Sequence, residues 1–144
     1  MIIHLGADHA GFALKEHLKK FLQNKGYTVK DFGAHKLIKT DDYPDYAVKV
    51  AKAVQKSGKG ILVCGSAEGV CIAANKFKGI RAVAVWTVQN AKLSREHNDA
   101  NILCLSGWQL KKKTAEKIAL TWLKTPFSGE KRHVRRIAKI KRLE

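Results

Sequence analysis

The stretch from Gly60 to Lys76, GILVCGSAEGVCIAANK, constrains the fold of this chain of 144 residues more than any other. A short apolar run stops at Cys64, small residues follow, and a helical run begins at Val70. That order is typical of a buried strand, a tight turn and the first turn of a helix. Such a turn points several backbone N–H groups at one place, where the helix dipole also favours negative charge. The stretch therefore predicts an anion-binding cradle that Cys64 faces from the end of the strand.

Further apolar runs alternate with amphipathic helical stretches along the rest of the chain. Strands that alternate with helices imply a parallel sheet covered on both faces. We therefore predict an α/β fold over residues 1–144, a single domain built as a three-layer α/β/α Rossmann-like sandwich around a five-stranded parallel sheet. Asp45 is the expected N-cap of the second helix. The predicted strands are 2–5, 27–32, 61–64, 80–86 and 102–105, and the predicted helices begin near 12, 46, 70, 88, 112 and 129.

The charge of the chain limits the classes of partner. Lys plus Arg number 28 against 12 for Asp plus Glu, a formal net charge of +16, which attracts phosphates on nucleic acid, membrane or a small substrate. The lysines are spread over several segments, and only 131–142 is a concentrated basic run within the predicted basic helix of about 129–144. This pattern favours a solvated surface with at most weak, non-specific affinity for nucleic acid.

Other sequence features narrow the setting and the chemistry. No apolar run approaches membrane-spanning length and the N-terminus lacks the layout of a signal peptide, so we expect a cytoplasmic protein without a membrane partner. Three cysteines, an odd number in apolar settings, indicate reduced thiols. The spacing of cysteine and histidine suggests no zinc site, and neither GxGxxG after the first strand nor GxxxxGK[ST] occurs. We expect no metal and no cofactor.

Within the central stretch, each candidate residue has a structural and a chemical interpretation. Cys64 is either a small core residue or, at the edge of the sheet where ligands bind, a reactive thiol whose pKa the nearby helix N-terminus lowers. Ser66 can cap the helix and still offer its hydroxyl to a ligand. Glu68 suits the first turn of a helix, although its charge counts against an anion beside it.

Three polar groups outside that stretch also have both a structural and a chemical interpretation on sequence alone. Asp8-His9 follows the first strand and is either a cap with a surface histidine or a pair of ligand contacts. His97-Asn98 is either an ordinary helix C-terminus or part of a site. Arg132 and Arg136 share a helix face and suit a phosphate, or they simply belong to the basic tail.

Taken together, these segments resemble the B-type ribose-5-phosphate isomerases, which share a superfamily with galactose-6-phosphate isomerase. The resemblance runs nearly the whole length of the chain. It is carried by the segments GADHAGFALK (6–15), DDYPDYA (41–47), GILVCGSAEGVCIAANK (60–76), GIRAVAVW (79–86) and LSREHNDAN (93–101), and by the pair Arg132/Arg136.

The resemblance implies a metal-free aldose–ketose isomerase that converts ribose 5-phosphate to ribulose 5-phosphate through an enediolate. Cys64 matches the base that moves the proton between C2 and C1. His97 matches the residue that opens the furanose ring, and Asn98 a neighbouring ligand contact. The remaining matches are contacts for the sugar, the enediolate and the phosphate: Asp8, His9, Gly65, Ser66, Ala67, Glu68, Gly69, Arg132 and Arg136. The resemblance also implies a site at the interface of a homodimer, or of a tetramer.

Two departures from the family pattern bear on specificity. Ala67 stands where the family loop usually has its middle glycine, and an alanine that needs positive φ is strained there. Trp108 follows Gly107, where the family commonly has an arginine. The alternatives are therefore an isomerase of a hexose 6-phosphate, such as allose or galactose 6-phosphate, a non-catalytic regulatory subunit, or a nucleic-acid-binding derivative of the fold.

Overall fold

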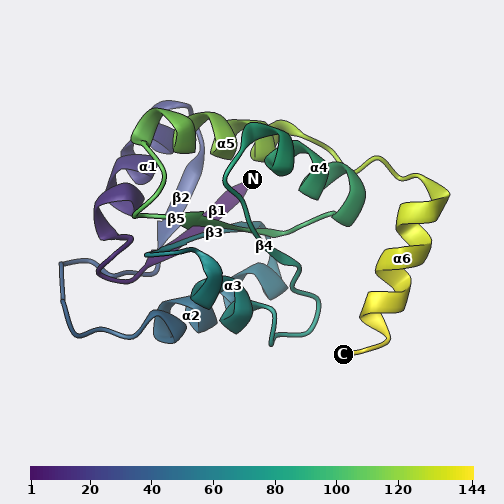
Figure 1. The fold of residues 1–144 in the computed structure, drawn as a ribbon, viewed down its shortest axis with the longest axis horizontal. Helices are drawn as coiled ribbons and strands as arrows, with labels where there is room; N and C mark the ends of the chain where they lie inside the picture. Colours follow the sequence, from purple (N-terminus) through teal and green to yellow (C-terminus); the bar gives the residue numbers. More distant parts are fainter.

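Five parallel strands form one sheet in the order β2-β1-β3-β5-β4. The computed structural model describes residues 1–144 and confirms the predicted three-layer α/β/α sandwich (Figure 1). The three inner strands are almost completely buried, as expected when helices cover both faces of a parallel sheet. The strands are β1 (Ile2–Ala7), β2 (Thr28–Asp31), β3 (Lys59–Cys64), β4 (Ala82–Ala84) and β5 (Ile102–Ser106).

Two groups of helices cover the two faces, and each group closes its own core (Figure 1). α1 (Phe12–Asn24), α4 (Val88–Asn98) and α5 (Lys112–Lys124) lie on one face, and α2 (Tyr43–Lys56) and α3 (Glu68–Ala74) lie on the other. The alternation of β1 shows the division, because Ile3 and Leu5 join the first core while His4 lines a cavity beside α2. The buried side chains Leu18 and Trp122 anchor the first group.

The two central strands send the chain to opposite faces of the sheet. β1 leads into α1 on one face, whereas β3 leads into α3 on the other. Loops that leave neighbouring strand ends in opposite directions open a crevice between them, which is where open α/β sheets bind ligands. In this chain that crevice lies between the loop after Ala7 and the loop after Cys64.

The structure corrects two predicted boundaries. α2 begins at Tyr43 rather than Tyr46, because Pro44 fits the first helical turn, where its missing N–H costs nothing. Asp42 therefore precedes the helix, and Asp45 is not the N-cap but an acid within the first turn. The fourth strand is only Ala82–Ala84, because the chain on either side of it makes no further ladder with β5.

α6 (Lys131–Lys141), the basic C-terminal helix, stands away from the rest of the chain beyond the β4 edge (Figure 1). The apolar side of this helix, formed by Val134, Ile137 and Ile140, is only partly covered. Ile137 is buried, but Val134 and Ile140 remain 49% and 45% exposed. α4 is the helix that α6 packs against, so much of α6 faces solvent. None of the helices has the length and apolar content needed to span a membrane.

Candidate active site

A cavity of about 410 Å³ lies in the crevice at the carboxyl ends of β1 and β3. We call it the thiol cavity, because Cys64 lies on its wall. It brings together seven of the predicted site residues, which come from the loop after β1 and the loop after β3. Those seven are Asp8, His9, Cys64, Gly65, Ser66, Glu68 and Gly69, and the other wall residues include Tyr43, Ile72 and Trp108.

The loop after β3 is held by the neighbouring strand β5. Gly107 N–H donates to the carbonyl oxygen of Cys64 at 2.8 Å, and Ser106 Oγ donates to that of Gly65 at 2.6 Å. The end of β5 and the residue after it therefore fix the two peptide groups that follow Cys64. A base that must reach a substrate carbon within a few tenths of an ångström needs such support.

Cys64 is 4% exposed, and burial raises the pKa of its thiol above the ordinary value of 9.0. The backbone N–H groups of Val70, Ala67 and Ser66 act in the opposite direction and lower that pKa, without cancelling the effect of burial. The expectation of a lowered pKa is therefore wrong for the free chain. The cradle of amides is present, but it surrounds a thiol that is protonated at rest.

Ala67 has the left-handed backbone conformation that the sequence raised as a question. Its φ is +75° and its ψ is −18°, and it directly precedes α3. An L-residue at such a φ stores roughly 1–2 kcal/mol of strain. Ser66 does not cap the helix through its side chain, and its hydroxyl accepts only a long hydrogen bond of 3.4 Å from Glu68 N–H. That hydroxyl remains available to a ligand.

Asp41 positions His9 at the opposite wall of the cavity. His9 Nδ1 lies 2.7 Å from Asp41 Oδ1, and the backbone N–H of His9 donates to the same oxygen at 3.0 Å. Tyr46 donates its hydroxyl to Asp41 Oδ2 at 2.9 Å. The hydrogen bond between His9 and Asp41 raises the pKa of His9. Burial, together with the separate hydrogen bond that Tyr46 donates to Asp41, raises the pKa of Tyr46 to about 12. His9 is therefore an oriented, readily protonated donor for an anionic substrate.

Asp8 is the second polar group from the loop after β1. It is buried, and its Oδ1 accepts a hydrogen bond of 3.0 Å from Gly11 N–H. Burial raises the pKa of this carboxyl, although the hydrogen bond from Gly11 and the charge of His9 lower it in part. Asp8 thus closes the turn that leads to α1 and still lines the cavity.

Two aromatic rings sit directly on the glycines of the loop. A side chain at Gly65 would place its Cβ 2.5 Å from the indole of Trp108, and one at Gly69 would lie 2.7 Å from the ring of Tyr43. Trp108 nevertheless remains 74% exposed, so its outer surface is free at the mouth of the cavity. Gly65 and Gly69 therefore act by admitting these rings as well as by shaping the turn.

Four other predicted site residues lie with His133 in a second group, which we call the His/Arg cluster: His97, Asn98, Arg132, His133 and Arg136. His97 at the end of α4 stacks on His133 of α6, with ring centroids 4.3 Å apart and planes at 15°. Burial lowers the pKa of His133, and the neighbouring His97 and Arg132 lower it further. Arg132 Nε donates a hydrogen bond of 2.8 Å to Glu130 Oε2.

The thiol cavity and the His/Arg cluster do not meet within one chain. None of the five residues of the cluster lines the thiol cavity, and Asn98 instead lines a separate hollow with Trp86. Figure 1 shows α6 beyond the β4 edge, away from α3 and the loop that precedes it. A single chain therefore presents two halves of the predicted site in different places.

Sequence reasoning gave no role to Tyr43, Asp41 or His133. The segment DDYPDYA carried the first two, and a carboxylate next to a tyrosine before a helix is too common a pattern to indicate a site by itself. The sequence feature that could have indicated His133 is its position between Arg132 and the apolar residues of the same helix. No group of three or more His, Cys, Asp or Glu side chains is arranged to hold a metal ion.

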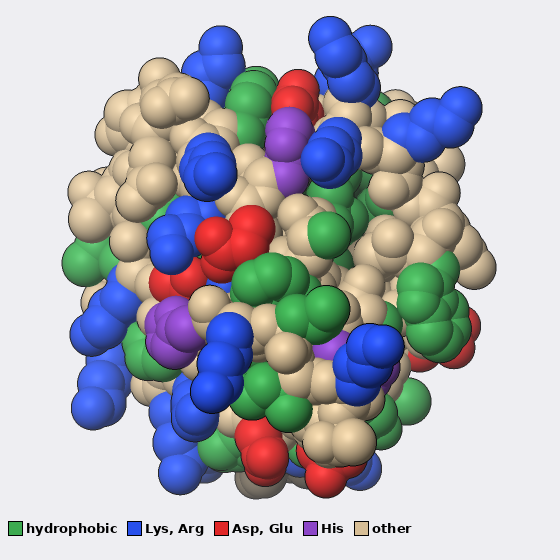
Figure 2. Space-filling model, turned by 90° about the vertical axis from the view of Figure 1, so that its left-hand side faces the viewer, with side chains coloured by type: hydrophobic (Ala, Val, Ile, Leu, Met, Phe, Trp, Pro, Cys, Tyr) green, Lys and Arg blue, Asp and Glu red, His purple; other side chains and the backbone are tan.

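The positive charge of the chain is dispersed over the face that carries the loop after β2. Figure 2 shows lysine and arginine side chains spread across this face, with apolar and acidic groups between them. A nucleic-acid surface usually presents a continuous basic patch or stripe. This face therefore lacks the continuous basic patch that the nucleic-acid-binding alternative needs.

The amide-lined thiol, the oriented histidine and the parallel sheet define an α/β protein with a site for a small anionic ligand. Comparison with known proteins identifies its family. Residues 3–140 match the family model described as Ribose/Galactose Isomerase, and the chain belongs to that family.

Individual relatives agree over nearly the full length of the chain. It is 43% identical to the probable ribose-5-phosphate isomerase B of Mycoplasma genitalium and 41% identical to ribose-5-phosphate isomerase B of Escherichia coli, in each case over 99% of this chain and 95% of the relative. The solved structure of the Clostridium thermocellum ribose-5-phosphate isomerase B superposes with a TM-score of 0.96 at 45% identity, covering 99% and 97% of the two chains. The Mycoplasma genitalium enzyme with bound ribulose-5-phosphate gives 0.95 at 42% identity, covering 99% and 95%.

Proposed function

We propose that this chain interconverts ribose 5-phosphate and ribulose 5-phosphate, with Cys64 as the base. The observation that carries the proposal is the thiol cavity, in which a buried sulfur is surrounded by backbone amides at the end of β3. Relatives of 41–43% identity that carry the name ribose-5-phosphate isomerase B support the reaction. The structure of the Mycoplasma genitalium relative with ribulose-5-phosphate supports the class of substrate.

The reaction needs a base that removes one proton and returns it to the neighbouring carbon. The thiolate of Cys64 takes the proton from C2 of the open-chain aldose, and the electron pair of that C–H bond forms the C1–C2 double bond of an enediolate. The C1 carbonyl oxygen takes up the negative charge in this step. The proton of the C2 hydroxyl then passes to that oxygen, which becomes the C1 hydroxyl, and the thiol delivers its proton to C1 as the C2 oxygen forms the ketone. Amides of the loop and Ser66 Oγ stabilise the enediolate oxygen.

The protonated thiol of the free chain must lose its proton before this step. The amides of Val70, Ala67 and Ser66 stabilise the thiolate once it forms, and the fraction of chains that carry it rises with pH. His9, whose pKa Asp41 raises, balances the charge of the anionic ligand on the opposite wall. The loop after β3 thus carries out proton transfer, and the loop after β1 stabilises the charge of the ligand.

We infer that a second copy of the chain supplies the His/Arg cluster to the thiol cavity. Ring opening by His97 and phosphate binding by Arg132 and Arg136 require these side chains to reach the same sugar as Cys64. Within one chain they do not line its cavity. The exposed Val134 and Ile140 on α6 support an isologous dimer in which this helix is covered.

Trp108 favours a pentose over a hexose in this arrangement. Its indole lies over Gly65 at the mouth of the thiol cavity, where a longer sugar would need additional room. The apolar face of the indole can also stack on the carbon side of a sugar ring. A hexose 6-phosphate is therefore the second candidate substrate, supported only by the breadth of the family model.

A direct isomerase assay tests the proposal. The full chain should convert ribose 5-phosphate, and allose 6-phosphate and galactose 6-phosphate should react at least about tenfold more slowly in kcat/KM. Cys64→Ala should lower kcat by about 10³-fold, the size of effect typical for a positioned base. Cys71→Ser is the matched control, because this second thiol lies outside the cavity. Equal activity of Cys64→Ala and the unmodified chain would contradict the assignment of the base.

A further inference from the structure

A second cavity of about 410 Å³ lies between the edge strand β2, the start of β1 and the C-terminal half of α2. We call it the lysine cavity, because four of its nine lining residues are lysines and none is acidic. It shares no lining residue with the thiol cavity. The isomerase mechanism gives it no role.

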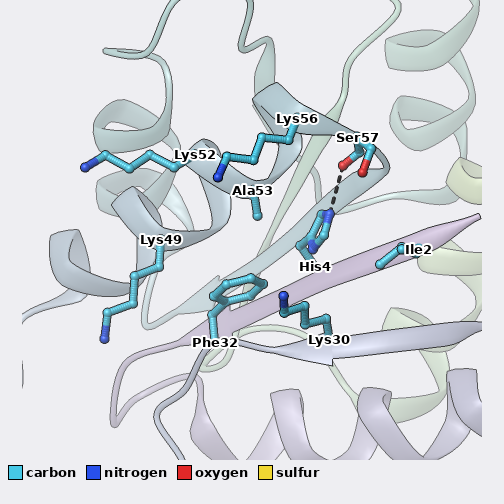
Figure 3. A pocket seen from close by; sticks show the side chains of 9 residues that line it. All are labelled: Ile2, His4, Lys30, Phe32, Lys49, Lys52, Ala53, Lys56 and Ser57. Carbon is cyan, nitrogen blue, oxygen red and sulfur yellow. Dashed lines mark hydrogen bonds between the residues drawn. The ribbon is translucent and has the colours of Figure 1, made fainter.

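The inner wall of the lysine cavity is aromatic and apolar. Phe32 and His4 meet edge to face with ring centroids 5.6 Å apart, and Ile2 and Ala53 complete this wall (Figure 3). Lys30 holds its ammonium 5.4 Å from the centroid of the Phe32 ring. The wall therefore offers a flat surface next to a positive charge, which suits an aromatic base.

His4 is an unusual component of this wall because it is 5% exposed and only half satisfied. Its Nε2 lies 2.8 Å from the carbonyl oxygen of Ser57, which can only accept, so Nε2 carries the proton. Its Nδ1 has no hydrogen-bond partner. A buried polar atom without a partner is uncommon in a folded protein, so this histidine is not explained by the packing of the wall alone.

The lysines occupy the rim. Figure 3 shows Lys30 and Lys56 reaching toward the space beside Phe32 and Ala53, whereas Lys49 and Lys52 extend outward from α2. Lysine ammonium groups bind phosphate oxygens as flexible point charges. The inner pair therefore lies where phosphates attached to a base on Phe32 would be placed.

We propose that the lysine cavity is a second ligand site that binds a nucleoside diphosphate. The base packs on Phe32 beside His4, and the two phosphates lie between Lys30 and Lys56, with Lys52 contributing charge from outside. The volume suits one small molecule. An apolar inner wall distinguishes this site from one for inorganic phosphate.

Calorimetric titration of the full chain with ADP tests this proposal, with ribose 5-phosphate and ribulose 5-phosphate at saturating equilibrium concentrations to occupy the thiol cavity. ADP should bind one site per chain, and Lys30→Glu/Lys56→Glu should weaken binding by about tenfold or more, since each tenfold step corresponds to about 1.4 kcal/mol. The control Lys20→Glu/Lys124→Glu changes the net charge equally at exposed positions on α1 and α5, and it should change the Kd by less than about twofold.

A second variant separates the base from the phosphates. Phe32→Leu keeps apolar volume but removes the ring, so it should weaken ADP by about fivefold or more and leave the weaker binding of pyrophosphate unchanged. The proposal is overturned if both pairs of charge reversals weaken ADP equally, if pyrophosphate binds as tightly as ADP, or if Phe32→Leu has no effect. Much tighter binding of a single-stranded oligonucleotide that depends on Lys30 and Lys56 would also overturn it, in favour of a nucleic-acid site.

Discussion

The thiol cavity and the His/Arg cluster differ in how completely one chain builds them. The thiol cavity lies at the ends of buried central strands, and hydrogen bonds from Ser106 and Gly107 fix its loop. The His/Arg cluster lies on a helix that stands beyond the edge of the sheet and leaves Val134 and Ile140 exposed. The first region is held by hydrogen bonds within one chain, whereas the side chains of the second do not line the thiol cavity of their own chain. The difference supports the proposal that a second copy of the chain completes the site.

Loss of Arg132 and Arg136 should have the largest effect on substrate binding among changes to the His/Arg cluster. Arg132→Ala/Arg136→Ala should raise the KM for ribose 5-phosphate by about 10- to 100-fold with a smaller change in kcat, because charge-assisted hydrogen bonds to a phosphate are among the stronger ones. Steady-state kinetics measures this split. Arg135→Ala/Arg142→Ala, a change of equal charge on the same tail, is the control and should leave KM within about twofold. A double variant with unchanged KM would remove α6 from the site.

The raised pKa of Cys64 in the thiol cavity should make kcat/KM depend on pH. The base acts as the thiolate, so kcat/KM should rise with pH by about tenfold per unit until the pH exceeds the raised thiol pKa of the free chain. Rate profiles measured from neutral to alkaline pH test this, after correction for titration of the substrate phosphate. Cys71→Ser should leave the profile unchanged. A rate that is already maximal and flat at neutral pH would contradict a protonated resting thiol.

Removal of the Asp41 charge should change mainly the pKa of His9, with a smaller effect on activity. Asp41→Asn should lower that pKa, because the hydrogen bond between the imidazole and the Asp41 carboxylate is the main cause of its increase. A raised folded pKa means that the His9–Asp41 pair stabilises the fold fully below the ordinary histidine pKa and loses this contribution as the pH rises through the folded value. NMR titration of the imidazole measures the shift. The exposed Asp42→Asn is the control, and an equal His9 pKa in both variants would show that Asp41 does not hold the imidazole.

The fold was predictable from the sequence because its signals are local. Each short apolar run that ends at a glycine, a serine or a cysteine marks the end of a strand, and the alternation with helices leaves a parallel sheet as the consistent arrangement. The loop after Cys64 and the pair Asp8-His9 were predicted for the same reason, since strand ends meet at one edge. Pro44 misled the prediction of α2, because it was interpreted as the end of a loop rather than the first turn of a helix.

The remaining features depend on contacts that no local pattern records. The pKa of Cys64 reflects a balance between burial and the amides of its loop, and only the packed structure shows that burial prevails. The ring of Tyr43 against Gly69, and that of Trp108 against Gly65, join segments far apart in the chain. The separation of His97 from Cys64 follows from strand order and from the position of α6, neither of which the spacing of residues determines.

Complementation between two variants with low kcat/KM tests the shared site most directly. Cys64→Ala lacks the base, and Arg132→Ala/Arg136→Ala lacks the phosphate contacts, so a mixed dimer contains one site with every group intact. Co-expression of the two variants should restore about a quarter of the unmodified kcat/KM at low substrate, because random pairing makes half of the dimers mixed and each has one intact site of two. Activity no higher than the average of the two separate variants would show that Cys64 and the arginines act within one chain, and would contradict the account.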